Sequence, residues 1–219
     1  MSYGFKVEVS GEYALFSRPE LKVERVSYDV ITPSAARGVL EAVFWKPAIR
    51  YVIDKITVCK KIRFENIRRN EISSKASSGK PHIFASDDRV QRASLVLKDV
   101  DYIIAFHFEA TDRLGERDLS EGSFNHGKFA DELRRRLIKG QCYHQPYLGC
   151  REFPAKLRLV MDDDPLLTPI AETRYLGLML YDIDYVKDDN GNITAWNPTY
   201  FNAQMENGVI DLQNVEVLR

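Results

Sequence analysis

The segment Arg89–Ala110 constrains the fold of this chain more than any other part of the sequence. Valine, leucine, isoleucine and aromatic residues are frequent in it, and this composition is typical of a β-strand. A second β-like segment, Arg50–Arg69, precedes it. Between the two lies Ser73–Lys80, which is rich in serine, lysine and glycine and predicts a flexible tip. We therefore expect two long strands that follow one another in the chain.

A strand and a helix come before these two segments. Residues 5–16 alternate apolar and polar side chains, which predicts a half-buried strand. Thr32 and Pro33 then provide an N-cap and a proline at the first helical position, and apolar residues recur at helical spacing until Pro47. The order strand–helix–strand–strand is the first half of a split βαβ unit.

The second half of that unit is also present. Phe129, Leu133 and Leu137 are four residues apart, and Gly140 stands where the end of a helix favours glycine. The next segment, Phe153–Val160, partly alternates and predicts a fourth strand. The sequence thus predicts an α+β protein with a ferredoxin-like (RRM-like) βαββαβ domain.

The rest of the chain predicts a small antiparallel β-sheet domain. Asp162–Pro165 interrupts the pattern. We therefore place residues 1–161 in the ferredoxin-like domain and residues 162–219 in a β appendage. Its strands and turns are predicted at Tyr175–Tyr185, Asp189–Asn192, Ile193–Phe201, Glu206–Gly208 and Val209–Leu218.

Charge and cysteine content limit the classes of function. The chain has 31 lysines and arginines against 32 aspartates and glutamates, so cations can favour a polyanion only where they gather locally. Three cysteines are too few for a disulfide framework, which predicts free thiols in a reducing compartment. The N-terminus does not resemble a signal peptide, and no apolar run has membrane-spanning length. We expect a soluble, cytoplasmic protein that does not enter a membrane.

Basic residues gather in two places, on or beside the segment Arg50–Arg69 and on the second predicted helix. Each cluster is either ordinary solvated charge or a phosphate-binding surface, because every lysine or arginine that contacts a phosphate releases a counterion. The residues expected to contact a nucleic-acid backbone are Lys60, Lys61, Arg63, Arg68 and Arg69 in the first cluster, and Arg134 and Arg135, next to Arg136, in the second.

The segment Gly122–Lys128 is the most suggestive chemically. Gly122 and Gly127 permit unusual backbone angles just before a helix, and the free amides at a helix start attract anions. A phosphate could rest there, with Lys128 as its cation and His126 as proton donor or acceptor. A glycine-rich lead-in to the helix, without chemistry, is the alternative.

Two further groups were weighed as sites. His144 follows the second predicted helix and could approach the same phosphate, whereas a zinc site with Cys142 and Cys150 matches no usual spacing. No metal and no cofactor are therefore expected. The run Asp162–Asp164 could bind Mg²⁺ in a metal-dependent DNase, although such runs are usually solvated turns.

Six short segments lie in order over nearly the whole chain: Gly11–Phe16, Ser27–Val30, Phe44–Pro47, Asn125–Lys128, Tyr147–Glu152 and Met205–Gly208. Together they resemble the CRISPR-associated Cas-five-d family of subtype I-C. The resemblance implies an endoribonuclease that binds the repeat hairpin of CRISPR precursor RNA and cuts at its 3′ base without a metal. It also implies a ferredoxin-like domain with a small β-sheet domain. The partners it implies are repeat RNA and the other subunits of the type I-C surveillance complex, and non-specific DNA binding is a further expectation.

The implied reaction is attack of a ribose 2′-oxygen on the adjacent phosphate, which leaves a 2′,3′-cyclic phosphate and a 5′-hydroxyl. It needs one group that takes the 2′ proton, one that protonates the leaving 5′-oxygen, and a cation that stabilises the phosphorane. Family nucleases carry a tyrosine before the Trp-Lys-Pro and a Lys-His pair after the Asn-x-Gly. This chain has Phe44 and Phe129 at those positions and matches only at Lys128.

Phenylalanine neither donates nor accepts a proton, so three interpretations remain open. His126 supplies the acid–base function, with Tyr28, Tyr143 or His144 assisting. Alternatively, Lys128 dominates a rearranged site, or the chain is a non-catalytic subunit that binds guide RNA. We favour a slow but active endoribonuclease, with Phe129 either a lost catalytic position or simply core. The residues expected to act are Lys128, His126 and Tyr28 in catalysis, and Lys46, Gly127 and His144, with the basic clusters, in RNA binding.

Overall fold

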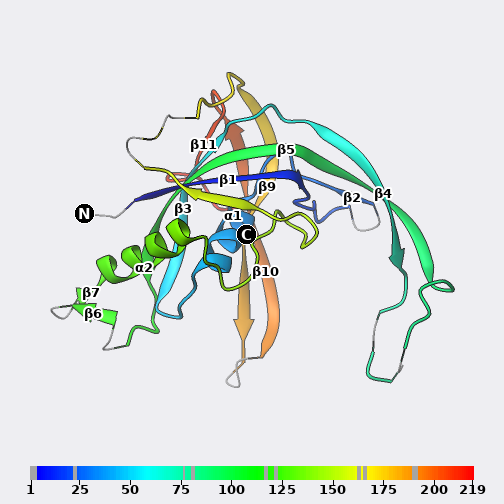
Figure 1. Cartoon of the computed structure of the whole chain (residues 1–219), viewed down its shortest axis with the longest axis horizontal. Helices are drawn as coiled ribbons and strands as arrows, with labels where there is room; N and C mark the ends of the chain where they lie inside the picture. The colour runs from blue at the N-terminus through cyan, green and yellow to red at the C-terminus, as the bar shows by residue number, and fades with distance from the viewer. Residues whose placement is uncertain are drawn as a thin grey trace.

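A curved, mainly antiparallel sheet forms the centre of the molecule, and its one parallel pair among the described strands is β2 with β5 (Figure 1). The computed structural model describes residues 4–21, 24–75, 77–79, 82–115, 118–120, 123–161, 164, 167–188 and 192–219. The main strands run in the order β11-β3-β5-β1-β8, and β2 and β4 also pair with β5. Their bounds are β1 Phe5–Ala14, β2 Arg25–Val26, β3 Ile49–Val58, β4 Phe64–Ile72, β5 Arg89–Ala110, β8 Lys156–Leu159 and β11 Val209–Asp211.

The strand β5 joins two parts of this sheet. Its second half lies between β1 and β3, and its first half pairs with β4 in an arm that projects from the sheet (Figure 1). The predicted strand at Arg89–Ala110 is therefore confirmed. The single segment predicted at Arg50–Arg69 is wrong as a continuous strand, because it divides into β3 and β4. The chain turns between them at Cys59–Arg63, where the Cys59 amide donates to the Asp101 carbonyl at 2.9 Å.

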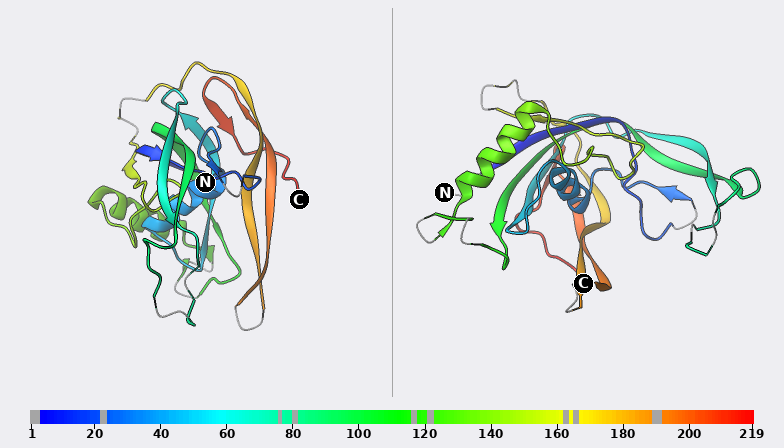
Figure 2. Two further views of the ribbon diagram at one scale, coloured as in Figure 1. Left: turned by 90° about the vertical axis from the view of Figure 1, so that its right-hand side faces the viewer. Right: turned by 60° about the horizontal axis from the view of Figure 1, so that its bottom comes forward.

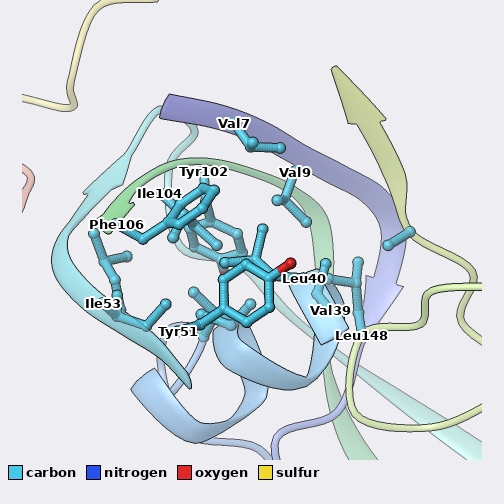
Figure 3. Close-up of a cluster of buried hydrophobic side chains, with 14 of the residues drawn as sticks. Val7, Val9, Val39, Leu40, Tyr51, Ile53, Tyr102, Ile104, Phe106 and Leu148 are labelled. Carbon is cyan, nitrogen blue, oxygen red and sulfur yellow. The ribbon is translucent and has the colours of Figure 1, made fainter. Parts of the chain in front are cut away.

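The helix α1, Pro33–Val43, fills the concave side of the sheet. Its predicted start is confirmed, since the Thr32 side chain accepts a hydrogen bond from the Ala35 amide at 3.1 Å. Val39 and Leu40 on this helix pack into the main core (Figure 3). Figure 2 shows α1 beneath the curved strands, with α2 to one side. The core side chains that Figure 3 labels on the strands and the neighbouring loop are Val7, Val9, Tyr51, Ile53, Tyr102, Ile104, Phe106 and Leu148.

The helix α2, His126–Lys139, packs against β8 and contacts α1. The predicted apolar stripe is confirmed, because Phe129, Leu133 and Leu137 are all buried. The helix begins three residues before that stripe, where the Asn125 side chain accepts from the Lys128 amide at 3.0 Å. It ends at Gly140, whose φ of 62° is the left-handed conformation that glycine adopts most easily. A short pair of strands, β6 Leu119–Ser120 and β7 Ser123–Phe124, leads into it.

The C-terminal part forms a hairpin of β9 Arg174–Lys187 and β10 Ile193–Met205, beside α1. Of the turn predicted at Asp189–Asn192, residues 189–191 lie outside the described residues. The third predicted strand leaves this hairpin, because β11 pairs with β3 in the main sheet instead. Asn207 and Gly208, with φ of 48° and 75°, make the tight turn that redirects it. The described chain is thus an α+β protein, mostly of strands with two helices, and none of its helices is long and apolar enough to span a membrane.

One glycine fixes the path of the loop between α2 and β8. Gly149 has φ +84°, and a Cβ there would overlap the Leu15 carbonyl. The neighbouring Leu148 carbonyl accepts from the Leu15 amide at 3.0 Å. Only a residue without a side chain lets the loop lie this close to the end of β1.

Candidate functional site

A cavity of about 880 Å³ lies between the end of α1 and the first turns of α2. Phe44 caps the C-terminus of α1, and Lys46 follows it in the chain. Lys128 and Phe129 come from the first turn of α2. The fold therefore brings together the three positions at which the sequence was compared with family nucleases. The described lining residues are Phe44, Lys46, Gly115, Asp118, Lys128, Phe129, Asp131, Glu132, Arg135 and Arg136.

Lys128 lies at the rim of this cavity with its side chain 45% exposed. Its Nζ is 2.8 Å from Asp118 Oδ1 and 5.3 Å from the centre of the Phe129 ring. The hydrogen bond from Lys128, together with the Gly115 amide, lowers the pKa of Asp118 below its ordinary value. Asp118 therefore stays ionised, and a phosphate that enters the cavity must share Lys128 with this carboxylate. Asp118 is not among the predicted site residues, because it precedes Lys128 by ten residues and no sequence motif connects the two.

Phe44 and Phe129 form an apolar wall of the cavity. Both are buried, and their ring centres are 6.4 Å apart. Phe129 also stacks on Phe124 at 5.3 Å, and the Tyr51 hydroxyl donates to the Phe44 carbonyl at 2.6 Å. The two rings are therefore core residues that face the cavity, and they bring no proton donor or acceptor to it.

Arg136 is the residue that links this wall to α2, and the sequence reading did not select it. Its guanidinium carbon lies 5.2 Å from the centre of the Phe44 ring, and its Nη1 donates to the Val43 carbonyl at 3.1 Å. Its Nε donates to Glu132 at 2.8 Å. Two arginines therefore share Glu132, because Arg135 also pairs with it at 2.7 Å, and both lower the pKa of that carboxyl. The spacing of Glu132 and Arg136, four residues apart on a helix, was the available signal.

His126 and Tyr28 were predicted to act with Lys128, and the structure places them differently. His126 opens α2, and its ring meets Phe124 edge to face at 4.3 Å. It does not belong to the described residues that line the cavity, and the same holds for Gly127 beside it. Tyr28 is buried and lies under Arg18, whose guanidinium carbon is 4.6 Å from the ring centre. Burial and the Glu20 carboxylate raise the pKa of Tyr28, so its hydroxyl stays protonated near neutral pH.

A second cavity, of about 970 Å³, adjoins the first. The two share Phe44, Lys46 and Arg136 in their linings. Tyr28 and His144 line the second cavity, so both stand near the Lys128 site without entering the first cavity. Of the predicted residues, the structure thus joins Lys128, Lys46 and Arg135 in one cavity and Tyr28, Lys46 and His144 in the next.

The remaining predicted RNA-binding residues lie elsewhere. Arg134 pairs with Asp131 and covers the Phe5 ring at 5.6 Å, which places it beside the first strand. Lys60, Lys61 and Arg63 lie in the connection from β3 to β4, where Arg63 pairs with Asp99 at 2.5 Å. Two more belong to the arm, with Arg68 exposed and Arg69 paired with Glu152.

The metal sites considered from the sequence have no support among the described residues. Among the described residues, no group of three or more histidine, cysteine, aspartate or glutamate side chains could hold a metal ion. Of the acidic run, Asp162 and Asp163 lie outside the described residues. Asp164 is held by Arg158 at 2.6 Å and by the Met161 amide at 2.9 Å. Its carboxylate is therefore engaged by the protein itself.

The fold defines the described chain as an α+β protein with one curved sheet, a long hairpin and two helices. A solved structure described as a CRISPR-associated protein shares this fold at 22% sequence identity, with a TM-score of 0.68 over 97% of this chain and 93% of the other. A functionally uncharacterized protein from Streptococcus mutans shares it with a TM-score of 0.65, at 22% identity and the same coverage of both chains. The chain belongs to the Cas5d family: the family model described as CRISPR-associated protein (Cas_Cas5) matches residues 4–213.

Two relatives are similar over nearly their whole length. One, from Mannheimia succiniciproducens, is 46% identical over 228 residues, which cover 97% of this chain and 96% of the relative. The other, from Thermus thermophilus, is 40% identical over 223 residues, which cover 94% and 90%. Both relatives are named CRISPR pre-crRNA endoribonuclease Cas5d.

Proposed function

We propose that this chain is an endoribonuclease that binds and cuts CRISPR repeat hairpins in precursor RNA. The proposal is supported by the names of the two relatives, which match more than nine-tenths of this chain. The observation that carries it is the cavity whose lining includes Lys128, Lys46 and Arg136. After the cut, the protein remains on the guide RNA as a subunit of the type I-C surveillance complex.

Lys128 is the residue that we assign to the scissile phosphate. As the 2′-oxygen attacks, negative charge grows on the phosphorane, and a cation placed beside it lowers the barrier. Lys128 Nζ can turn from Asp118 toward such a phosphate because its side chain is half exposed. Lys46 and Arg136 supply further positive charge in the same cavity. The reaction produces a 2′,3′-cyclic phosphate and a free 5′-hydroxyl, and no bound metal takes part in the proposed step.

The reaction also needs a group that takes the 2′ proton and a group that protonates the leaving oxygen. Phe44 and Phe129 cannot exchange protons, and burial raises the pKa of Tyr28, so this hydroxyl can donate a proton but does not act as the base near neutral pH. His126 stands two residues before Lys128 and is the remaining candidate at the start of α2. General acid–base catalysis contributes about 10²- to 10⁴-fold to such reactions, so a site that relies mainly on charge is expected to be slow.

We also propose that the first part of the chain, residues 1–161, is a ferredoxin-like domain and that residues 162–219 form its appendage. The strand order β3-β5-β1-β8, with α1 before β3 and α2 before β8, supports the βαββαβ assignment. The pairing of β11 with β3 anchors the appendage on the domain.

The test of the proposed function uses the purified protein and its own repeat RNA in EDTA. A second RNA carries a 2′-deoxy nucleotide at the cut site, because DNA-like sugars lack the attacking oxygen. We expect the all-ribose strand alone to be cut, with a cyclic phosphate on the upstream product. Cutting of the 2′-deoxy strand, or loss of cutting in EDTA, contradicts the proposed chemistry.

The buried phenylalanines favour a second candidate, a guide-RNA-binding subunit without cleavage. In that case both RNAs are bound intact at nanomolar protein, and the affinity falls steeply as salt rises. The same experiment therefore separates the two functions.

A further inference from the structure

The second cavity carries exposed aromatic side chains that the reaction at Lys128 does not use. Tyr143 is 84% exposed, Trp45 is 54% exposed and Tyr185 is 52% exposed, and all three line this cavity. His144 and Tyr147 join them, with their rings stacked at 6.2 Å between centres. Aromatic rings exposed in a group mark a surface that another molecule covers.

Three separate parts of the chain build this cavity and hold it open. Trp45 follows the residue that caps α1, and Tyr185 belongs to β9. The loop that carries Tyr143 is fixed at both ends, because the Tyr143 amide donates to the Ala42 carbonyl at 2.9 Å and Gly149 lies against the end of β1. The backbone that carries Tyr143 is therefore fixed before a ligand binds, which reduces the entropy lost on binding.

The charges of the lining suit a ligand that combines flat rings with phosphates. Arg37, Lys46 and Arg136 are cationic, whereas the described lining has a single carboxylate, Glu41. Arg37 is paired with Glu41 at 3.0 Å and with Asp182 at 2.6 Å, and Arg136 is paired with Glu132 at 2.8 Å. Lys46 is therefore the lining cation that has no carboxylate partner among the described residues. Aromatic faces bind nucleobases of any identity by stacking, and nearby cations hold the backbone.

The position of the cavity indicates which part of an RNA would enter it. Phe44, Lys46 and Arg136 line both cavities, so the second cavity adjoins the place where a phosphate would meet Lys128. We propose that the second cavity is a subsite for one unpaired RNA base next to the scissile phosphate, stacked on Tyr143 and Trp45. This subsite rests on the proposed function, because the repeat RNA provides the strand.

The test is a double-mutant cycle that combines each protein variant with each RNA variant. The Kd of every combination is measured by filter binding with the full-length protein. The RNA is the repeat with a 2′-deoxy nucleotide at the cut site, so that it is not consumed. A series of such RNAs carries a single abasic nucleotide at each position around the cut. Tyr143→Ala is the main variant, and its exposed side chain makes loss of folding unexpected. Tyr175→Ala is the matched control, since Tyr175 is 62% exposed on β9 outside the cavity.

We expect Tyr143→Ala to weaken binding of the intact repeat by about 10- to 100-fold, as stacking on one base does elsewhere. The loss disappears for one abasic position beside the cut, while Tyr175→Ala changes nothing. Trp45 gives an independent signal. The chain has two tryptophans, so Trp196→Phe leaves Trp45 as the sole reporter, and its fluorescence is quenched by the intact repeat and not by that abasic RNA.

The outcomes separate the subsite from the proposed function. If the repeat binds tightly and Tyr143→Ala leaves Kd unchanged for every RNA in the series, the subsite is overturned and the nuclease proposal is not affected. The exposed rings would then suit a protein partner. The expected coupling without cleavage of the all-ribose repeat supports the subsite in a binding subunit. Absence of repeat binding overturns both proposals.

Discussion

Replacing Lys128 by alanine is the most direct perturbation of the proposed site. Removal of one group that stabilises the developing charge costs about 10²- to 10³-fold in a site closed to water. The Lys128 side chain is 45% exposed, and its Nζ pairs with Asp118 at 2.8 Å, so solvent and this carboxylate both weaken its effect. We therefore expect Lys128→Ala to slow cleavage by about 10- to 100-fold.

The assay is single-turnover cleavage of repeat RNA in EDTA, with protein in excess and RNA Kd measured in parallel. The loss is expected in the rate, while the slope of binding affinity against salt falls by only about one phosphate contact. Lys139→Ala is the matched control, because Lys139 is an exposed lysine in the last turn of the same helix. Lys128→Arg keeps the charge and is expected to retain more of the rate than Lys128→Ala.

A second variant separates charge stabilisation from folding. Asp118→Asn removes the carboxylate that competes for Lys128, so repeat RNA is expected to bind more tightly and cleavage to continue.

The assignment of Lys128 to the phosphate is refuted if Lys128→Ala and Lys139→Ala both cut the repeat RNA at a rate within twofold of the parent protein.

Three further predictions concern the missing proton donors, the buried acid and the loop glycine. The double substitution Phe44→Tyr and Phe129→His restores the groups found in family nucleases, and is expected to raise the single-turnover rate by about 10²-fold. Unchanged or slower cleavage counts against it. Asp101 is 8% exposed, its Oδ1 has no hydrogen-bond partner in the described structure, and burial and Glu8 raise its pKa. The folded state therefore favours protonated Asp101, and the stability that this protonation contributes is lost as pH rises from the ordinary aspartate range through the raised pKa. Asp101→Asn should then raise the free energy of unfolding at pH 7 by about 1 kcal/mol and Tm by about 2–4 °C, a gain that vanishes in acid. Gly149→Ala should cost about 3 kcal/mol or more in urea unfolding, whereas Gly177→Ala, with the same φ of 84° and open space around it, should cost about 1–2 kcal/mol.

The elements that the sequence predicted best are those with a local signal. The helix from Pro33 was fixed by its N-cap and its apolar period, and Gly140 marked the end of α2. The division of Arg50–Arg69 into β3 and β4 was missed, because both strands are β-like and nothing local marks the point where the chain changes partner. The strand predicted from Val209 is present as β11, but its partner was missed for the same reason, since its pairing with β3 depends on a surface more than 150 residues earlier in the chain.

The candidate site shows the same division. Lys128 could be selected from sequence because a glycine, a helix start and a family motif coincide there. Asp118 could not be joined to it, because no local pattern marks the loop that brings this carboxylate back to Lys128. Arg136 could not be joined either, because it contacts Phe44 only after α1 and α2 have packed together.

The sequence by itself determined the class of fold, the two helices, most strands and the family, because side-chain periodicity, helix caps and short motifs are properties of neighbouring residues. The tertiary structure decided that Phe44 and Phe129 share one buried wall, that Asp118 holds Lys128, and that exposed aromatic residues from three segments surround a second cavity. The buried wall and the second cavity join residues far apart in the chain, and Asp118 reaches Lys128 through the path of the loop before α2. They depend on how strands pair and helices pack, and no local pattern encodes them.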